Sequence, residues 1–110
     1  MTRSRIGIVG AGQLGRMLAL AGYPLGIRCL FLDRSADTPG ALVAPIIVGD
    51  LEDPQKLDEL ARRSDVVTFD WENISGSALA PLRNITEVRP PRAALEVSQD
   101  RIPEIGRAHV

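Results

Sequence analysis

A glycine-rich segment near the start of the chain has the residues and spacing of a phosphate-binding turn. Gly10-Ala11-Gly12-Gln13-Leu14-Gly15 fits the pattern G-x-G-x-x-G. Glycines at these positions permit a tight turn and let backbone amides approach a ligand closely. A helix that begins here would add unpaired N–H groups and the positive end of its dipole, and both favour an anion. The segment therefore predicts a phosphate site at a helix N-terminus.

The same pattern occurs in dinucleotide-binding proteins, where an acidic residue about twenty positions later binds the ribose hydroxyls of NAD. Asp33 stands at that distance, directly after an apolar run. Two interpretations of Asp33 stay open: an acid that binds a ribose, and a residue that only caps the following loop. The glycine pattern by itself slightly favours a dinucleotide site.

The elements that must position this turn can be read from the apolar pattern. The run Ile6 to Val9 precedes the turn and is typical of a buried parallel strand, and apolar residues at helical spacing follow it until Gly22 and Pro24. Strands alternating with helices at this spacing predict an α/β fold, a Rossmann-like parallel sheet flanked by helices. The other predicted strands are 27–32, 46–48, 65–69 and 86–88. The other predicted helices are one that begins at Asp53-Pro54, a short one over 75–82, and one that begins near Arg92.

Composition and charge narrow the classes of function. The 110 residues suffice for one domain with a single core. Thirteen basic and fourteen acidic residues leave a net charge of -1, which provides no basic field for nucleic acid or for an anionic membrane. Without a signal peptide or a membrane-spanning apolar run, the chain is expected to be cytoplasmic. The single cysteine, Cys29, excludes an internal disulfide and is expected to lie in the core.

Three segments carry a resemblance to a known family, in order and in spacing. They are Gly10 to Leu18 with Pro24-Leu25-Gly26, then Asp65 to Ile74, then Val88-Arg89-Pro90 with Ala94-Leu95-Glu96 and Gln99-Asp100-Arg101. Together they resemble the N-terminal preATP-grasp domain of the N5-carboxyaminoimidazole ribonucleotide synthetase family. These ATP-grasp ligases of purine biosynthesis are also described as the ATPase subunit of phosphoribosylaminoimidazole carboxylase. The resemblance covers most of the chain.

The resemblance implies a site for a ribonucleotide in place of a dinucleotide. In the family, the glycine turn receives the 5′-phosphate of 5-aminoimidazole ribonucleotide, and a glutamate binds the ribose hydroxyls. A further position, matched here by Arg101, contacts ATP. The family has glutamate and phenylalanine where this chain has Asp70 and Trp71, so the roles of these two residues stay open. The positions of this chain that match the ribonucleotide site are Gly12, Gln13, Leu14 and Glu72.

The reaction implied by the resemblance is the carboxylation of 5-aminoimidazole ribonucleotide by bicarbonate, driven by ATP with magnesium, in an enzyme that forms a homodimer. The family carries its nucleotide-binding lysines and metal-binding acids in two further domains, whereas this chain has a single lysine, Lys56. We therefore expect this chain alone to lack ligase activity and to bind neither ATP nor magnesium tightly. Two other functions remain open: a stand-alone NAD-binding module, and a non-catalytic interaction domain with a vestigial site.

The end of the chain departs from the family pattern. We expect a ribonucleotide-binding domain over residues 1–90 and, over 91–103, the start of a helix that leads to a missing ATP-grasp domain. Pro103 interrupts that helix, and residues 104–110 can be encoded by a common sequencing-library adapter read in frame. We therefore expect 104–110 to be a non-native tail. The only histidine, His109, lies in this tail and is not expected to take part in catalysis.

Overall fold

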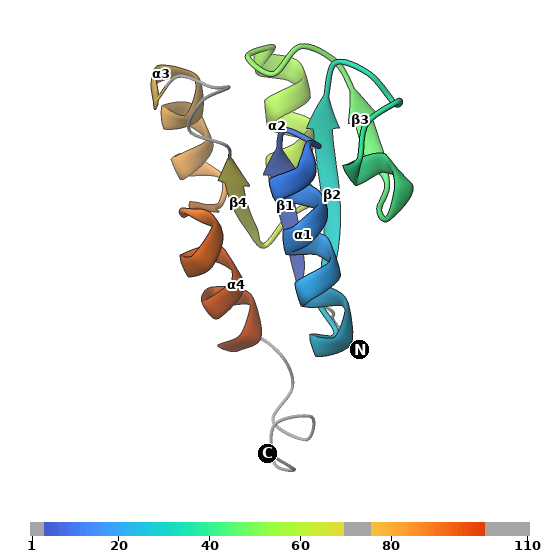
Figure 1. Ribbon diagram of the computed structural model, residues 1–110. Helices are drawn as coiled ribbons and strands as arrows, with labels where there is room; N and C mark the ends of the chain where they lie inside the picture. Colours follow the sequence, from blue (N-terminus) through green and yellow to red (C-terminus); the bar gives the residue numbers. More distant parts are fainter. Residues whose placement is uncertain (1–3, 70–75, 101–110) are drawn as a thin grey trace.

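The computed structural model describes residues 4–69 and 76–100, which form a parallel sheet between two layers of helices (Figure 1). The five strands lie in the order β3-β2-β1-β4-β5, and each neighbouring pair is parallel. This order confirms the predicted Rossmann-like α/β fold. The strands are β1 (Arg5–Val9), β2 (Arg28–Asp33), β3 (Ile46–Val48), β4 (Val66–Phe69) and β5 (Glu87–Val88). The α-helices are α1 (Gln13–Gly22), α2 (Pro54–Arg62), α3 (Gly76–Leu79) and α4 (Pro91–Asp100), and the 3-10 helices are η1 (Tyr23–Leu25), η2 (Gly40–Leu42) and η3 (Ala80–Asn84).

Prolines and caps explain where the helices begin and end. Asp53 is the N-cap of α2, and its carboxylate accepts a hydrogen bond from the Gln55 amide at 2.9 Å, as expected for an acid before a proline at the first helical position. The single helix predicted over 75–82 is wrong in its second half, where α3 gives way to η3. Pro81 has no N–H to donate to the preceding turn, so the α-helix cannot continue through it.

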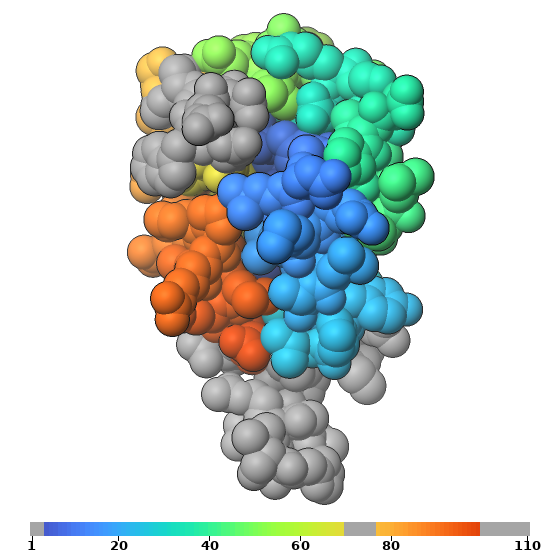
Figure 2. All heavy atoms as spheres, in the orientation of Figure 1, coloured from blue at the N-terminus to red at the C-terminus, as the bar shows by residue number. Residues whose placement is uncertain are grey.

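The two faces of the sheet have separate apolar cores. On one face α1 and α4 pack over β1, β2 and β4, and Figure 2 shows these two helices side by side. On the other face α2, α3 and η3 cover the sheet. No described helix has the length and apolar composition that crossing a membrane requires. The large side chains of the first core include Ile6, Ile8, Ile27, Phe31 and Val66, and those of the second include Leu32, Leu51, Leu57, Leu60 and Phe69.

Helix α1 packs against the sheet through its smallest residues. The predicted helical spacing is confirmed, but Leu14 and Met17 are 52% and 63% exposed. The buried residues of α1 are Gly15, Ala19 and Gly22. Because glycine and alanine have little or no side chain, the helix axis comes close to β1 and β2. Leu18 packs partly against the core, while Leu14, Met17 and Leu20 face outward.

Cys29 lies in the core as predicted, and burial raises the pKa of its thiol from 9.0 to about 11. We expect folded protein at pH 8 to resist thiol reagents that react with the unfolded chain. Above pH 9 the unfolded thiol ionises while the folded thiol stays protonated. The free energy of unfolding should therefore fall by about 2 kcal/mol between pH 9 and 11 from this group. Urea titrations across this range should show this part of the pH dependence in wild type and not in Cys29→Ala.

Candidate functional site

The glycine turn lies at the point where the sheet reverses its strand order. Strand β1 is central, with β2 on one side and β4 on the other, and successive strands are added outward in both directions. In open α/β sheets, ligands bind at such a point, beyond the carboxyl ends of the strands. The turn that joins β1 to α1 leaves the sheet at this edge. The predicted phosphate site is therefore in the expected part of the fold.

Backbone hydrogen bonds hold the turn in place from both sides. The Gly10 amide donates to the Leu32 carbonyl at 2.8 Å, and the Gly40 amide donates to the Ala11 carbonyl at 2.7 Å. Gly10 has a φ of 106°, a left-handed conformation that residues with a side chain rarely adopt. These contacts fix the turn against β2 and η2 before any ligand binds.

The first turn of α1 presents its backbone amides without a capping side chain. Gly12 is the N-cap, no side chain among residues 4–69 and 76–100 caps this helix start, and no acidic residue lies in the first turn. Gln13 and Leu14 are exposed on the same end of the helix. An uncapped helix start carries unpaired N–H groups and a partial positive charge. The arrangement fits an anion at this end of α1.

The three glycines of the motif are present for different physical reasons. A Cβ on Gly15 would lie 2.8 Å from the Gly10 carbonyl oxygen and 2.8 Å from Phe31 Cε1. A Cβ on Gly12 would meet no atom of the described residues within 4 Å, and the Gly12 φ of -79° suits any residue. The fold thus accounts for Gly10 and Gly15 but not for Gly12. The space next to Gly12 is available to a ligand.

Asp33 ties the turn to the end of β2. One oxygen of its carboxylate accepts a hydrogen bond from the Ala11 amide at 2.8 Å, and the other accepts one from the Arg34 amide at 2.7 Å. The bond to the Arg34 amide caps the following loop, but Asp33 does not only cap that loop, because it also holds the Ala11 amide. The bond to Ala11, from a residue 22 positions away, was not predicted.

Removal of the Asp33 carboxylate should destabilise the turn. In Asp33→Ala the amide of the buried Ala11 loses its acceptor, and we expect the free energy of unfolding to fall by about 1–3 kcal/mol. Asp33→Asn keeps an acceptor oxygen and should lose less. Urea denaturation checks both, with Asp37→Ala as a control for an exposed carboxylate of the same loop. Equal stability of Asp33→Ala and wild type would show that this hydrogen bond does not support the turn.

Two hollows adjoin the glycine turn. A small cavity of about 20 Å³ lies between the starts of α1 and α4 and is lined by Gly12, Gly15, Thr68 and Pro91, among others. A larger hollow of about 410 Å³ lies on the other side, where Gln13 and Arg16 face the loop at Thr38. The Nε atom of Arg16 and the hydroxyl of Thr38 are buried without a partner in the described part of the chain.

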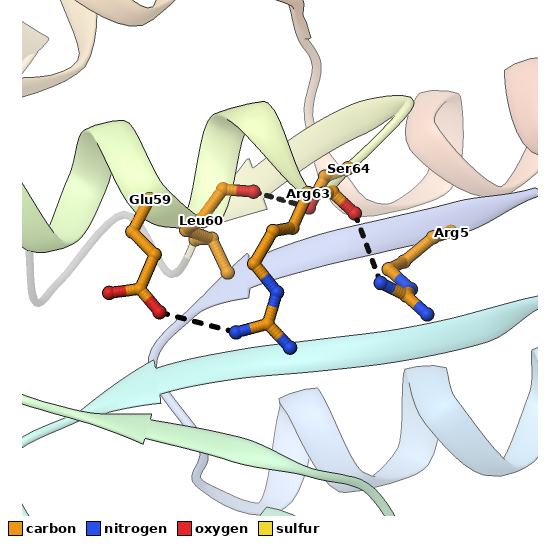
Figure 3. A network of polar contacts seen from close by, with 5 residues as sticks. All are labelled: Arg5, Glu59, Leu60, Arg63 and Ser64. Atoms are coloured by element: carbon orange, nitrogen blue, oxygen red, sulfur yellow. Dashed lines mark hydrogen bonds and ion pairs between the residues drawn. The ribbon is translucent and has the colours of Figure 1, made fainter.

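A third hollow, of about 740 Å³, lies at the opposite edge of the sheet and includes four arginines. Two of them form ion pairs with acidic residues of α2: Arg62 with Asp58 at 2.8 Å, and Arg63 with Glu59 at 3.2 Å. The guanidinium carbon of Arg28 lies 4.9 Å from the centre of the Tyr23 ring. The fourth, Arg5, donates to the Arg63 carbonyl at 3.5 Å (Figure 3). Because this edge holds the amino ends of the strands, it is the weaker candidate for a ligand site.

The structure describes only part of the predicted site. It places Gly12, Gln13 and Leu14 together at the start of α1. Glu72 and Arg101 lie outside the described residues, as do Asp70, Trp71 and the predicted tail over 104–110. Sequence reasoning did not place Thr68 beside the glycine turn, where it lines the small cavity. A threonine within an apolar strand was the only signal for it in the sequence.

The family model of the ribonucleotide synthetase preATP-grasp domain matches residues 3–99. An N5-carboxyaminoimidazole ribonucleotide synthase of Brucella melitensis is 49% identical over 102 residues, which cover 92% of this chain and 28% of that protein. The crystal structure of the N5-carboxyaminoimidazole ribonucleotide synthetase of Thermus thermophilus superimposes with a TM-score of 0.72 at 45% identity, covering 88% of this chain and 27% of that one.

A more distant solved structure contains ligands. It is the N5-carboxyaminoimidazole synthase of Aspergillus clavatus in complex with ADP and 5-aminoimidazole ribonucleotide, with a TM-score of 0.72 at 27% identity, covering 84% of this chain and 25% of that one. The chain thus spans about a quarter of the length of the relatives that it matches.

Proposed function

Because the chain belongs to the ribonucleotide synthetase preATP-grasp domain family, we propose that it is the substrate-binding N-terminal part of an ATP-dependent ligase of purine biosynthesis. That ligase carboxylates 5-aminoimidazole ribonucleotide with bicarbonate and ATP. The observation that carries the proposal is the uncapped start of α1 beside the open space at Gly12. A relative of the same fold was solved with this ribonucleotide and ADP.

In the proposed complex the backbone does most of the binding. The amides at Gly12, Gln13 and Leu14 donate to the phosphate of the ribonucleotide, and the dipole of α1 stabilises its charge. Asp33 keeps the Ala11 segment of the turn in position through the 2.8 Å hydrogen bond. Glu72 binds the ribose hydroxyls and Arg101 contacts ATP, as the family resemblance implies. The chain supplies orientation of the substrate, which is a large part of catalysis in ligases of this kind.

The rest of the reaction depends on groups outside the described residues. Within 4–69 and 76–100 no three His, Cys, Asp or Glu side chains come together as a metal site would require. We therefore assign no magnesium ligand to these residues and derive no step through the metal. The proposed full-length enzyme is a cytoplasmic homodimer that uses bicarbonate, and the 110-residue chain alone has no turnover.

Ligand titrations followed by amide NMR test the proposal. On addition of 5-aminoimidazole ribonucleotide we expect the amide signals of Gly12, Gln13 and Leu14 to shift, with a dissociation constant of about 1 mM, or ~4 kcal/mol. The free riboside without phosphate should not shift them. NADH is the control for the alternative function. If NADH binds more tightly than the ribonucleotide, the chain is a dinucleotide-binding module and the proposal is wrong.

A further inference from the structure

A threonine hydroxyl is buried without a partner at the carboxyl end of β4. Thr68 is 1% exposed, and its Oγ1 has no hydrogen-bond partner among the described residues. Buried hydroxyls are nearly always hydrogen-bonded, because burial removes the bonds that they make to water. Valine fills almost the same volume without this cost. The unpaired hydroxyl therefore indicates a partner that binds from outside the chain.

The cavity next to Thr68 has room for one oxygen atom. Its volume is about 20 Å³, and a cavity of roughly 10–15 Å³ already admits a water-sized group. Gly12 and Gly15 of the glycine turn form part of its wall. Thr68 lies opposite Ile8 in the parallel register of β4 and β1, one residue before β1 ends. The hydroxyl and the phosphate-binding turn therefore share one cavity.

The charge around the cavity favours an anionic oxygen. Helix α1 begins at Gln13 and α4 begins at Pro91, and residues of both helix starts line the cavity. Each helix has ten residues and no acidic residue in its first turn. The positive ends of two helix dipoles thus meet beside the unpaired hydroxyl.

We propose that Thr68 is a further ligand-binding residue, whose hydroxyl donates a hydrogen bond to one oxygen of the phosphate held at the glycine turn. This inference rests on the proposed phosphate site. It adds a side-chain donor to a site that otherwise uses backbone amides. It also explains why the strand that faces β1 carries a threonine where its neighbours Val66 and Val67 are aliphatic.

The test compares Thr68→Val with Thr68→Ser in the 110-residue chain. The probes are 5-aminoimidazole ribonucleotide and inorganic phosphate, titrated by NMR. Loss of one hydrogen bond to a charged acceptor should weaken binding of both probes about tenfold or more in Thr68→Val. Thr68→Ser keeps the donor and should bind within about threefold of wild type. In wild type, the Thr68 methyl signal should shift with the same dissociation constant as the Gly12 amide, which tests the contact without any substitution.

Two controls separate this inference from its premise. Ser98 is also fully buried with an unpaired hydroxyl, but it does not line the cavity, so Ser98→Ala should leave phosphate binding unchanged. Gly12→Asp places a carboxylate at the proposed phosphate position and should weaken binding at least about tenfold. If Gly12→Asp loses phosphate while Thr68→Val binds as wild type does, the role of Thr68 is refuted and the phosphate site stands. If wild type binds neither probe, both proposals fail.

Discussion

Gly12→Asp is expected to stabilise the fold and to weaken phosphate binding at the same time. The new side chain points into open space from a residue with φ -79° and ψ -162°, which is the conformation of an N-cap. Its carboxylate can accept the free amides of α1 and complement the helix dipole. Replacing glycine also lowers the conformational entropy of the unfolded chain. The two effects together should raise the free energy of unfolding by about 0.5–1 kcal/mol.

The same carboxylate occupies the position proposed for the phosphate and repels it. We expect the affinity for 5-aminoimidazole ribonucleotide to fall at least about tenfold, since like charges a few ångströms apart in a partly exposed site cost about 1.4 kcal/mol or more. Thermal denaturation measures the first effect and an NMR titration measures the second. Leu20→Asp, on the exposed side of the same helix, controls for net charge and should bind as wild type does. Unchanged ribonucleotide affinity in Gly12→Asp would remove the phosphate from this end of α1.

The sheet was predictable because its strands are buried on both sides. Central parallel strands such as β1 and β4 are short continuous apolar runs, and glycine or proline marks the ends of the helices between them. Local chemistry also predicted the cap at Asp53, because its hydrogen bond spans only two residues. The helix predicted over 75–82 was wrong beyond Leu79, because Pro81 has no N–H to donate to the preceding turn.

Most of the contacts around the candidate site could not be predicted, because they join residues that are distant in sequence. The bond from the Ala11 amide to Asp33 depends on β1 and β2 being neighbours in a fixed register. Apolar spacing in α1 specifies a helix but not which of its stripes packs on the sheet. Gly15 and Ala19 face the sheet, and Leu14 and Met17 do not. Which residues face the sheet depends on how closely the helix approaches Phe31. The unpaired state of the Thr68 hydroxyl is likewise a property of its surroundings.

Gly15→Ala is expected to destabilise the fold far more than Gly12→Ala, although both substitutions add one methyl group to the turn. The new Cβ would lie 2.8 Å from the Gly10 carbonyl oxygen and 2.8 Å from Phe31 Cε1, and both distances are well inside van der Waals contact. Overpacking of this kind costs about 1–3 kcal/mol, so the melting temperature should fall by at least about 4 °C. Gly12→Ala, with nothing within 4 Å, is the matched control and should stay within about 1 kcal/mol of wild type.

The two contacts of the new methyl group can be separated by a second substitution. Phe31→Leu removes the ring atom but leaves the Gly10 carbonyl, whose position is fixed by the turn and by the Gly10 amide bond to Leu32. In the double variant we therefore expect only part of the lost stability to return, measured as a coupling energy in a double-mutant cycle. Full recovery would mean that the aromatic contact alone excludes a side chain at Gly15. Partial recovery would show that the backbone of the turn itself requires glycine at position 15. The same glycine would then be required for the close approach of α1, which brings the helix start to the carboxyl edge of the sheet.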